Sequence, residues 1–304
     1  LFTDSSNLSC NGVSLSVSLG GVGFASAPGV IVAPTSGLMT TETGESDQFS
    51  VYLTTAPESD VTVTVASNDE TNSLSWFRKG ADGGPLVHVG DTPTGKLGPY
   101  GVCAGMIGGV YHAGATYKDG LVQLWRIDND GHGAVEASLA RTVQLGGQLE
   151  GCGFDDELAT LFIGEEEHGV WSLDLSNPQS NPQSVDTIAA GNGLVMDVEG
   201  MSLWLGKNGG GYLVVSAQAA DRFVVYDRAA PHAVRGVIRI VGSADGAIDG
   251  VSHTDGLDVT SAPLPGYPRG ILVVQDDGNP ASGVDQNFKI VDWADVEAAL
   301  GLPR

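Results

Sequence analysis

The chain has 304 residues, of which 37 are acidic and 14 basic, so that its formal net charge is −23 at pH 7. Nucleic acids are polyanions that proteins bind through clustered lysine and arginine, so this balance excludes a nucleic acid as the partner. No apolar run reaches the roughly 18 residues that a helix needs to span a membrane, which argues against a membrane partner.

The first 67 residues fall into two stretches. Residues 1–27 are rich in Ser, Gly and Asn and show no clear period, which predicts an irregular N-terminal segment. Residues 28–67 contain three runs, 30–32, 49–53 and 61–65, in which apolar and polar residues alternate as in half-buried strands. This second stretch resembles part of a Calx-β-like sandwich repeat.

A repeat begins near residue 72, within a predicted repeat domain of residues 68–304. Each copy is a short apolar strand, a polar gap, and a second strand that ends near an aromatic residue. The five copies reach Trp76, Trp125, Trp171, Tyr226 and Trp293, at intervals of 46 to 67 residues. Together with 44 glycines, this period predicts an all-β fold, a β-propeller of about five or fewer blades with an N-terminal β-strand extension. The alternative is two sandwiches whose aromatic residues share a spacing by chance.

The chain has three cysteines, Cys10, Cys103 and Cys152. They lack the paired short spacings of a zinc site and are too few for a disulfide scaffold. One bridge, from Cys103 to Cys152, is an open alternative to buried free thiols.

Acidic residues gather around short apolar strands in the middle of the chain. Glu165 and Glu166 end one strand, and Asp197 and Glu199 are two residues apart, so they project to one face of another. Carboxylates in such places repel one another unless they reach solvent or share a cation. Glu165 to Glu167 as a solvated edge is the competing interpretation.

Further oxygen donors follow downstream. Gln218 offers an amide oxygen at the end of a strand, and Asp255 and Asp258 lie around a glycine turn, where they could also bind turn amides. Mixed carboxylate and amide oxygens are the ligands that calcium prefers, so the set predicts a Ca²⁺ site.

The order of these motifs resembles the β-propeller phytases. The resemblance covers about residues 97–304 and rests on this series: Glu150-Gly151-Cys152, Glu165-Glu166, Asp197-Val198-Glu199-Gly200, Ser216-Ala217-Gln218, Tyr226-Asp227-Arg228, Thr254-Asp255-Gly256, Val274-Gln275-Asp276 and Gln286-Asn287-Phe288-Lys289. No Gly-x-Ser-x-Gly elbow is present, so a serine nucleophile of that type is not expected.

The resemblance implies a six-bladed family fold and a calcium-dependent phytase of the 3-phytase type, which removes phosphate from phytate, myo-inositol hexakisphosphate, by attack of metal-activated water. It implies a secreted protein, extracellular or periplasmic, and a monomer unless a partner completes the ring. The implied metal ligands are Glu150, Glu165, Glu166, Asp197, Glu199, Gln218, Asp255 and Asn279; of these, Glu150, Glu166, Asp197 and Glu199 are implied to be catalytic. The implied phosphate contacts are Tyr100, Lys118 and Lys289.

The opening blades depart from the family pattern. The Asp-Asp pair ahead of a tryptophan, the lysine of an Asn-Lys-type turn and the arginine of an Arg-Pro-Asn-type turn are all missing, and residues 28–67 resemble a different module. A non-catalytic propeller that calcium stabilises, and that binds phosphate or a surface partner, is therefore the alternative to an active enzyme.

Overall fold

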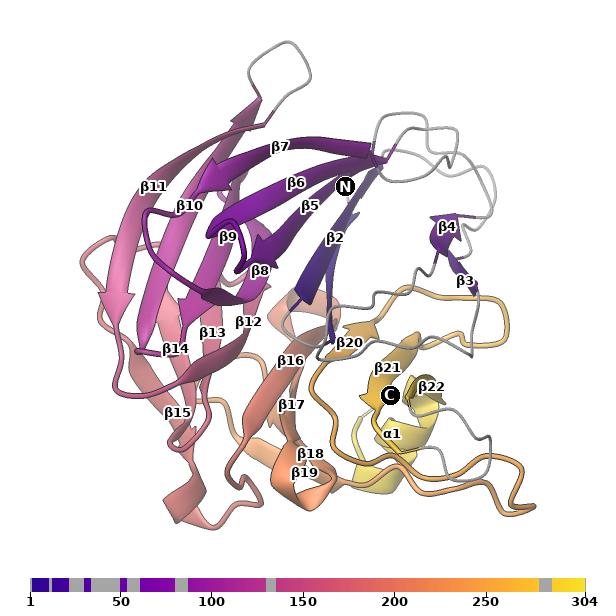
Figure 1. The fold of residues 1–304 in the computed structure, drawn as a ribbon. Coiled ribbons are helices and arrows are strands. Elements are labelled where there is room, and N and C mark those ends of the chain that lie inside the picture. Colours follow the sequence, from indigo (N-terminus) through magenta and orange to yellow (C-terminus); the bar gives the residue numbers. More distant parts are fainter. Residues whose placement is uncertain are drawn as a thin grey trace.

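The computed structural model describes residues 2–10, 13–21, 30–33, 50–53, 61–79, 87–129, 135–278 and 286–303. In these residues five antiparallel sheets stand around a common axis as the blades of a β-propeller (Figure 1). The predicted fold class, with about five blades, is confirmed.

The first blade is a five-stranded sheet in the order β1-β2-β5-β6-β7. Its strands are β1 (Phe2–Cys10), β2 (Val13–Gly21), β5 (Val61–Asn68), β6 (Ser73–Lys79) and β7 (Val87–Pro93). Strands β1 and β2 thus lie within residues 1–27, for which the sequence showed no period. Strands β3 (Val30–Ala33) and β4 (Ser50–Leu53) form a separate hairpin pair. The division at residues 27 and 67 stays a prediction.

The next three blades each have four antiparallel strands. The second blade has β8 (Pro99–Ile107), β9 (Val110–Tyr117), β10 (Leu121–Asn129) and β11 (Val135–Gln144). The third blade has β12 (Leu149–Asp155), β13 (Thr160–Glu165), β14 (Gly169–Asp174) and β15 (Gln183–Thr187). The fourth blade has β16 (Val198–Leu205), β17 (Gly211–Ala217), β18 (Arg222–Asp227) and β19 (Val234–Ile238). Short 3₁₀ turns follow β15, β16 and β17 at Ile188–Ala190, Lys207–Gly209 and Gln218–Ala220.

The fifth blade has three described strands and a helix. The strands are β20 (Leu257–Thr260), β21 (Ile271–Asp276) and β22 (Asn287–Asp292), and α1 (Trp293–Leu300) follows at once. The Asp292 side chain caps α1 by accepting a hydrogen bond from the Ala294 amide at 2.9 Å. Among the described residues no helix has the length and apolar character needed to cross a membrane.

The aromatic repeat has a structural basis. Four of its members lie on the strand next to the outermost one of their blades: Trp76 on β6, Trp125 on β10, Trp171 on β14 and Tyr226 on β18. The fifth, Trp293, is the first residue of α1 and stacks on Trp204 with ring centroids 5.4 Å apart. The helix thus supplies packing for the fourth and fifth blades.

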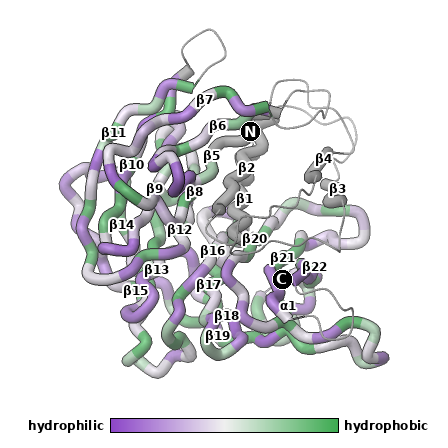
Figure 2. The backbone as a smooth tube through the Cα atoms, in the orientation of Figure 1, coloured by the Kyte–Doolittle hydropathy of each residue, from purple (hydrophilic) through white to green (hydrophobic). Residues whose placement is uncertain are grey.

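The core lies between the blades. Among the residues that the structure describes, each of four buried hydrophobic clusters takes side chains from two neighbouring blades; one joins Leu74 and Trp76 of the first to Val102 and Tyr117 of the second. Along the tube in Figure 2 hydrophobic and hydrophilic segments alternate, as blades with two buried faces and solvated turns require. Strand β1 contacts β8, β16 and β20, so the first blade touches strands of the second, fourth and fifth blades.

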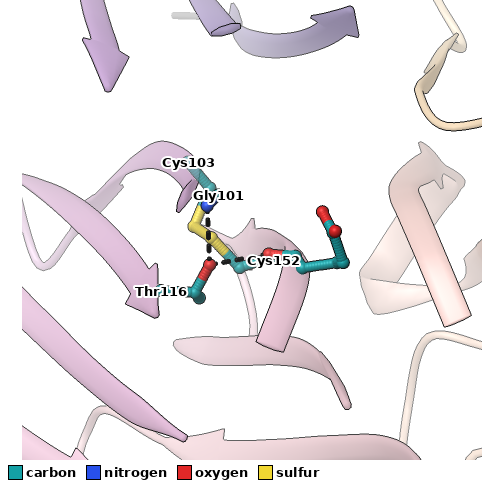
Figure 3. The surroundings of a disulfide bond; sticks show 5 residues. Gly101, Cys103, Thr116 and Cys152 are labelled. Atoms are coloured by element: carbon teal, nitrogen blue, oxygen red, sulfur yellow. Dashed lines mark hydrogen bonds between the residues drawn. A yellow bond between two sulfur atoms is a disulfide. The ribbon is translucent and has the colours of Figure 1, made fainter. Parts of the chain in front are cut away.

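A disulfide joins two inner strands. Cys103 of β8 and Cys152 of β12 form it, which decides between the two alternatives, the bridge and free thiols, that the sequence left open (Figure 3). Beside it, the Gly101 amide donates to the Thr116 hydroxyl oxygen at 3.0 Å, and that hydroxyl donates to the Glu150 carbonyl at 2.7 Å. The second and third blades are therefore linked both covalently and by hydrogen bonds at one end.

Candidate metal centre

Three glutamates from the third and fourth blades meet at the mouth of the propeller. Glu150 lies on β12, Glu166 directly follows β13, and Glu199 lies on β16. One carboxylate oxygen of each lies within 4.8 Å of those of the other two. Glu199 is only 8% exposed, and Glu150 and Glu166 are half-buried.

Equivalent positions on successive inner strands explain this meeting. Glu150 is the second residue of β12, Glu199 is the second of β16, and Tyr100 is the second of β8. Asp255 lies just ahead of β20, where its carbonyl accepts a hydrogen bond from the Gly200 amide at 2.7 Å. Since the inner strands of a propeller begin at the same end, one position on each blade faces the same mouth.

Burial and the neighbouring carboxylates disfavour the charged forms of Glu150 and Glu199. Burial, followed by the neighbouring carboxylates, raises the pKa of Glu199 to about 10. Burial, partly offset by a hydrogen bond from the Tyr100 hydroxyl, raises the pKa of Glu150 to about 8. Among the described residues no lysine or arginine forms an ion pair with these carboxylates. Such a group needs protons or a cation to become stable.

Glu165 and Glu166 point to different surroundings. The Gln148 amide donates a hydrogen bond to Glu166, which holds that carboxylate in the cluster. Glu165 is buried and accepts a hydrogen bond from the Trp171 indole at 2.7 Å. The structure therefore brings Glu166, and not Glu165, into the group of three.

Three further predicted ligands lie around the cluster. Asp197, in a left-handed backbone conformation with φ of 58°, precedes β16, and its charge adds to the rise in the pKa of Glu199. The Gln218 amide nitrogen donates to Asp255, which leaves the amide oxygen as the atom able to ligate a cation. Burial raises the pKa of Asp255, and its charge acts on both Glu150 and Glu199. Asn279 lies outside the described residues.

Lys118 and Tyr100 stand at the edge of the cluster. The Lys118 ammonium lies 3.9 Å from the centroid of the Tyr100 ring, a cation–π contact, and Lys118 itself is exposed. The Tyr100 hydroxyl hydrogen-bonds Glu150. A positive charge is thus held close to the glutamates without pairing with them.

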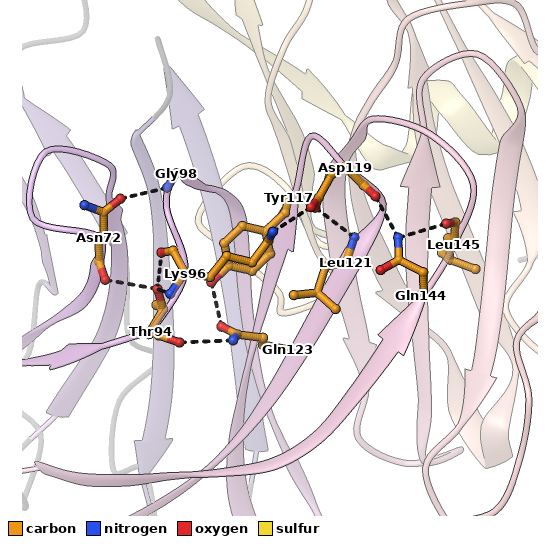
Figure 4. Close-up of polar contacts among 10 residues, drawn as sticks. All are labelled: Asn72, Thr94, Lys96, Gly98, Tyr117, Asp119, Leu121, Gln123, Gln144 and Leu145. Carbon is orange, nitrogen blue, oxygen red and sulfur yellow. Dashed lines mark hydrogen bonds and ion pairs between the residues drawn. The ribbon is translucent and has the colours of Figure 1, made fainter.

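Lys118 lies between Tyr117 and Asp119, and hydrogen bonds hold both of these neighbours, as Figure 4 shows. The neighbouring Asp119 binds the Lys96 ammonium at 2.5 Å, and its carbonyl accepts from the Gln144 amide at 2.7 Å. The Tyr117 hydroxyl donates to Gln123 at 2.6 Å, and the amide nitrogen of Gln123 donates to the Thr94 carbonyl at 3.1 Å. These contacts connect the first and second blades and fix the place of the turn.

Lys289, which the resemblance implied as a phosphate contact, is buried beside two carboxylates. It is 7% exposed, and its ammonium lies 2.6 Å from Asp276, 2.9 Å from Asp249 and 2.8 Å from the Asn287 amide oxygen. Because two carboxylates already balance its charge, this placement favours a structural role within the fifth blade.

The donor set fits a hard divalent cation. All the gathered groups are carboxylate or amide oxygens, the ligands that Ca²⁺ and Mg²⁺ prefer, and no described histidine or cysteine belongs to the cluster. When ionised, the three clustered carboxylates carry more negative charge than their surroundings compensate, and a divalent ion would balance it.

Sequence reasoning did not identify the residues that orient this group. Gln148 and Thr116 act through hydrogen bonds to Glu166 and to the Glu150 backbone. The sequence does carry a signal for the site position on each blade, next to which these two residues act. A tyrosine or acid followed by glycine recurs about every 50 residues, at Tyr100-Gly101, Glu150-Gly151, Glu199-Gly200 and Asp255-Gly256.

Comparison with known proteins identifies the family of this chain. The 3-phytase of Bacillus subtilis (strain 168) is 36% identical over 200 residues, which are 64% of this chain and 51% of that protein, so the chain spans about half the length of this relative. Two solved structures have lower sequence identity. A functionally unknown protein from Desulfotomaculum acetoxidans DSM 771 is 15% identical, with 75% of this chain and 79% of that chain covered and a TM-score of 0.45. BBS1N in complex with ARL6DN is 12% identical, with 86% of this chain and 71% of that chain covered and a TM-score of 0.42. Residues 41–303 match the model of the phytase family, and the chain belongs to that family.

Proposed function

We propose that the chain is a calcium-dependent phosphomonoester hydrolase that removes phosphate from inositol hexakisphosphate. The observation that carries this proposal is the meeting of Glu150, Glu166 and Glu199 at one mouth of the propeller, in a member of the phytase family. In a chain with a net charge of −23, a hexakisphosphate can approach only where cations reverse the local field.

The glutamates would hold the metal. Glu150, Glu166 and Glu199 are the inner ligands, and Asp197, Asp255 and the Gln218 amide oxygen are placed to complete the oxygen set. Calcium, when bound, supplies positive charge to the phosphate oxygens and makes water a better nucleophile. The Tyr100 hydroxyl favours the ionised form of Glu150, because its hydrogen bond lowers the pKa of that carboxyl and so offsets part of the rise that burial causes.

Lys118 would receive the substrate. Its ammonium is exposed, and the Tyr100 ring below it leaves its hydrogen-bond donors free to point outward. A lysine is a point charge suited to a phosphate oxygen. The ties on Asp119 keep the turn beside the cluster, so that a phosphate bound by Lys118 lies next to the glutamates.

We also propose that the protein is secreted and monomeric. The Cys103–Cys152 disulfide fits an oxidising compartment, since cytosolic thiols are kept reduced. Strand β1 of the first blade contacts β20 of the last blade within one chain, which supports a monomer.

The test is phosphate release from inositol hexakisphosphate at neutral pH, with calcium titrated against chelator. We expect release by the wild type with calcium, its loss in Glu199→Gln, and no change in the matched control Asp128→Asn, an exposed acid paired with Arg126. Calcium that raises the melting temperature without any release would replace the proposed enzyme by a non-catalytic, calcium-stabilised propeller.

A further inference from the structure

The glycine that follows each site residue lies against the next blade. A Cβ placed on Gly151 would be 2.6 Å from the Glu199 carbonyl oxygen, and one placed on Gly200 would be 2.6 Å from the Asp255 carbonyl oxygen. On Gly101 the distance to the Glu150 carbonyl oxygen would be 2.0 Å. Real Cβ atoms essentially never approach within 3.0 Å of another heavy atom, so no side chain fits at these positions.

In each case the carbonyl belongs to the residue whose side chain enters the site. Gly101 rests on Glu150, Gly151 on Glu199, and Gly200 on Asp255. The closest atoms are backbone atoms, which cannot swing aside as the end of a long side chain can. The distance between neighbouring site carboxylates is therefore governed by how closely these inner strands approach.

Hydrogen bonds also hold the strands together at two of these contacts. The Thr116 hydroxyl bridges the Gly101 amide and the Glu150 carbonyl, with distances of 3.0 and 2.7 Å. The Gly200 amide donates directly to the Asp255 carbonyl at 2.7 Å. The strands are thus pulled together at the level of the site, and the absence of a side chain permits the approach.

We infer that Gly151 and Gly200 are positioning residues that set the spacing of the site carboxylates and so the size of the cation that the site holds, and that Gly101 sets the approach of Tyr100 to Glu150 in the same way. The inference rests on the proposed function, because it concerns the same metal centre. A wider spacing lengthens the metal–oxygen distances, and Mg²⁺, which requires about 2.0–2.1 Å, tolerates this less than Ca²⁺ at about 2.3–2.6 Å.

The chain offers a matched control. Gly105 also lies on β8 and packs on β12, where an added Cβ would be 2.3 Å from the Phe154 Cβ. Gly105 lies toward the end of β8, whereas Tyr100 lies at its start, where it faces Glu150 of β12. Gly105→Ala therefore disturbs the packing of the same two blades without a site carboxylate beside it.

The experiment compares the full-length wild type with Gly151→Ala and Gly105→Ala, all stripped of metal. Calorimetry measures the Ca²⁺ and Mg²⁺ affinities, and thermal unfolding in chelator measures stability. We expect both variants to lose stability, but only Gly151→Ala to lose Ca²⁺ affinity, by about tenfold or more as when other residues that orient metal ligands are replaced. Its Mg²⁺ affinity should fall further. Gly200→Ala serves as the second variant if Gly151→Ala does not fold.

Equal Ca²⁺ affinities in Gly151→Ala and Gly105→Ala would overturn the inference while leaving the proposed metal centre intact. If the wild type binds no Ca²⁺, the proposed function fails instead. A crystal structure of metal-free Gly151→Ala then decides the inference by itself: a wider separation of Glu150 from Glu199 than in the wild type upholds it, and an unchanged separation refutes it.

Discussion

The Tyr100 hydroxyl forms a hydrogen bond with the Glu150 carboxylate, and this bond connects the second blade to the third at the mouth of the propeller. It lowers the pKa of Glu150, against burial and the neighbouring acids. Tyr100→Phe should therefore raise the pKa of Glu150 further and weaken Ca²⁺ binding at neutral pH by about tenfold, measured by calorimetry.

Tyr117→Phe is the control for that substitution. Tyr117 is buried, and its hydroxyl donates to Gln123 at 2.6 Å, within the network that holds the turn of Lys118. Loss of this buried hydrogen bond should cost about 1–2 kcal/mol of unfolding free energy and leave Ca²⁺ affinity unchanged. Equal affinity losses in the two variants would refute the direct role of Tyr100.

The raised pKa values predict how stability changes with pH. For Glu150 and Glu199 the ordinary pKa is 4.5, whereas in the folded protein it is about 8 and about 10. Between these values the folded state binds more protons than the unfolded state, so stability falls as the pH rises. In chelator, the melting temperature should fall from about pH 5 to pH 8.

Calcium should reverse that trend, because the ion takes the place of the protons and binds more tightly as the carboxylates ionise. Glu199→Gln should flatten the fall seen in chelator, since the group with the largest shift no longer titrates. A metal-free melting temperature that rises steadily from pH 5 to pH 8 would contradict the charge balance described for the cluster.

The disulfide between Cys103 and Cys152 should stabilise the fold through the unfolded chain. It closes a loop with a sequence separation of 49 residues, for which the chain-entropy estimate is about 4 kcal/mol. Urea unfolding of Cys103→Ala/Cys152→Ala should show a loss of this order relative to the oxidised wild type. A reducing agent should destabilise the wild type but leave the double variant unchanged.

Arg228 and Asp155 form a fully buried ion pair between the fourth and third blades, with nitrogen–oxygen distances of 2.8 and 2.9 Å. Arg228→Met leaves the Asp155 carboxylate buried without its cation and should cost about 3–5 kcal/mol in urea unfolding. Adding Asp155→Asn removes that charge but keeps an oxygen for the Leu158 amide, so the double variant should recover part of the loss. No recovery would show that shape, not charge, dominates there.

The fold class followed from local patterns. The aromatic spacing of Trp76, Trp125, Trp171 and Tyr226 predicted the blade count because each of these residues lies on the strand next to the outermost one of its blade. Residues 2–21 gave no such signal, yet they form β1 and β2. Their Ser- and Gly-rich strands are specified by pairing with β5 and by contact with β8 and β20, interactions between residues distant in sequence.

The site was predicted in part. The sequence named Glu150, Glu166 and Glu199, and the structure brings them together. It could not separate Glu165 from Glu166, because the difference lies in a hydrogen bond from Trp171 to one and from Gln148 to the other. It also could not show that Lys289 is held by Asp249 and Asp276, since those acids come from other segments.

By itself the sequence determined the all-β class, the period of the blades and the identity of the acidic residues, because these depend on alternation, spacing and the order of motifs along the chain. Only the tertiary structure decided which acids meet, how closely Gly151 approaches Glu199, and that Cys103 pairs with Cys152. Those outcomes depend on the distance between neighbouring blades, which is set by packing across the ring and is not encoded in any single strand.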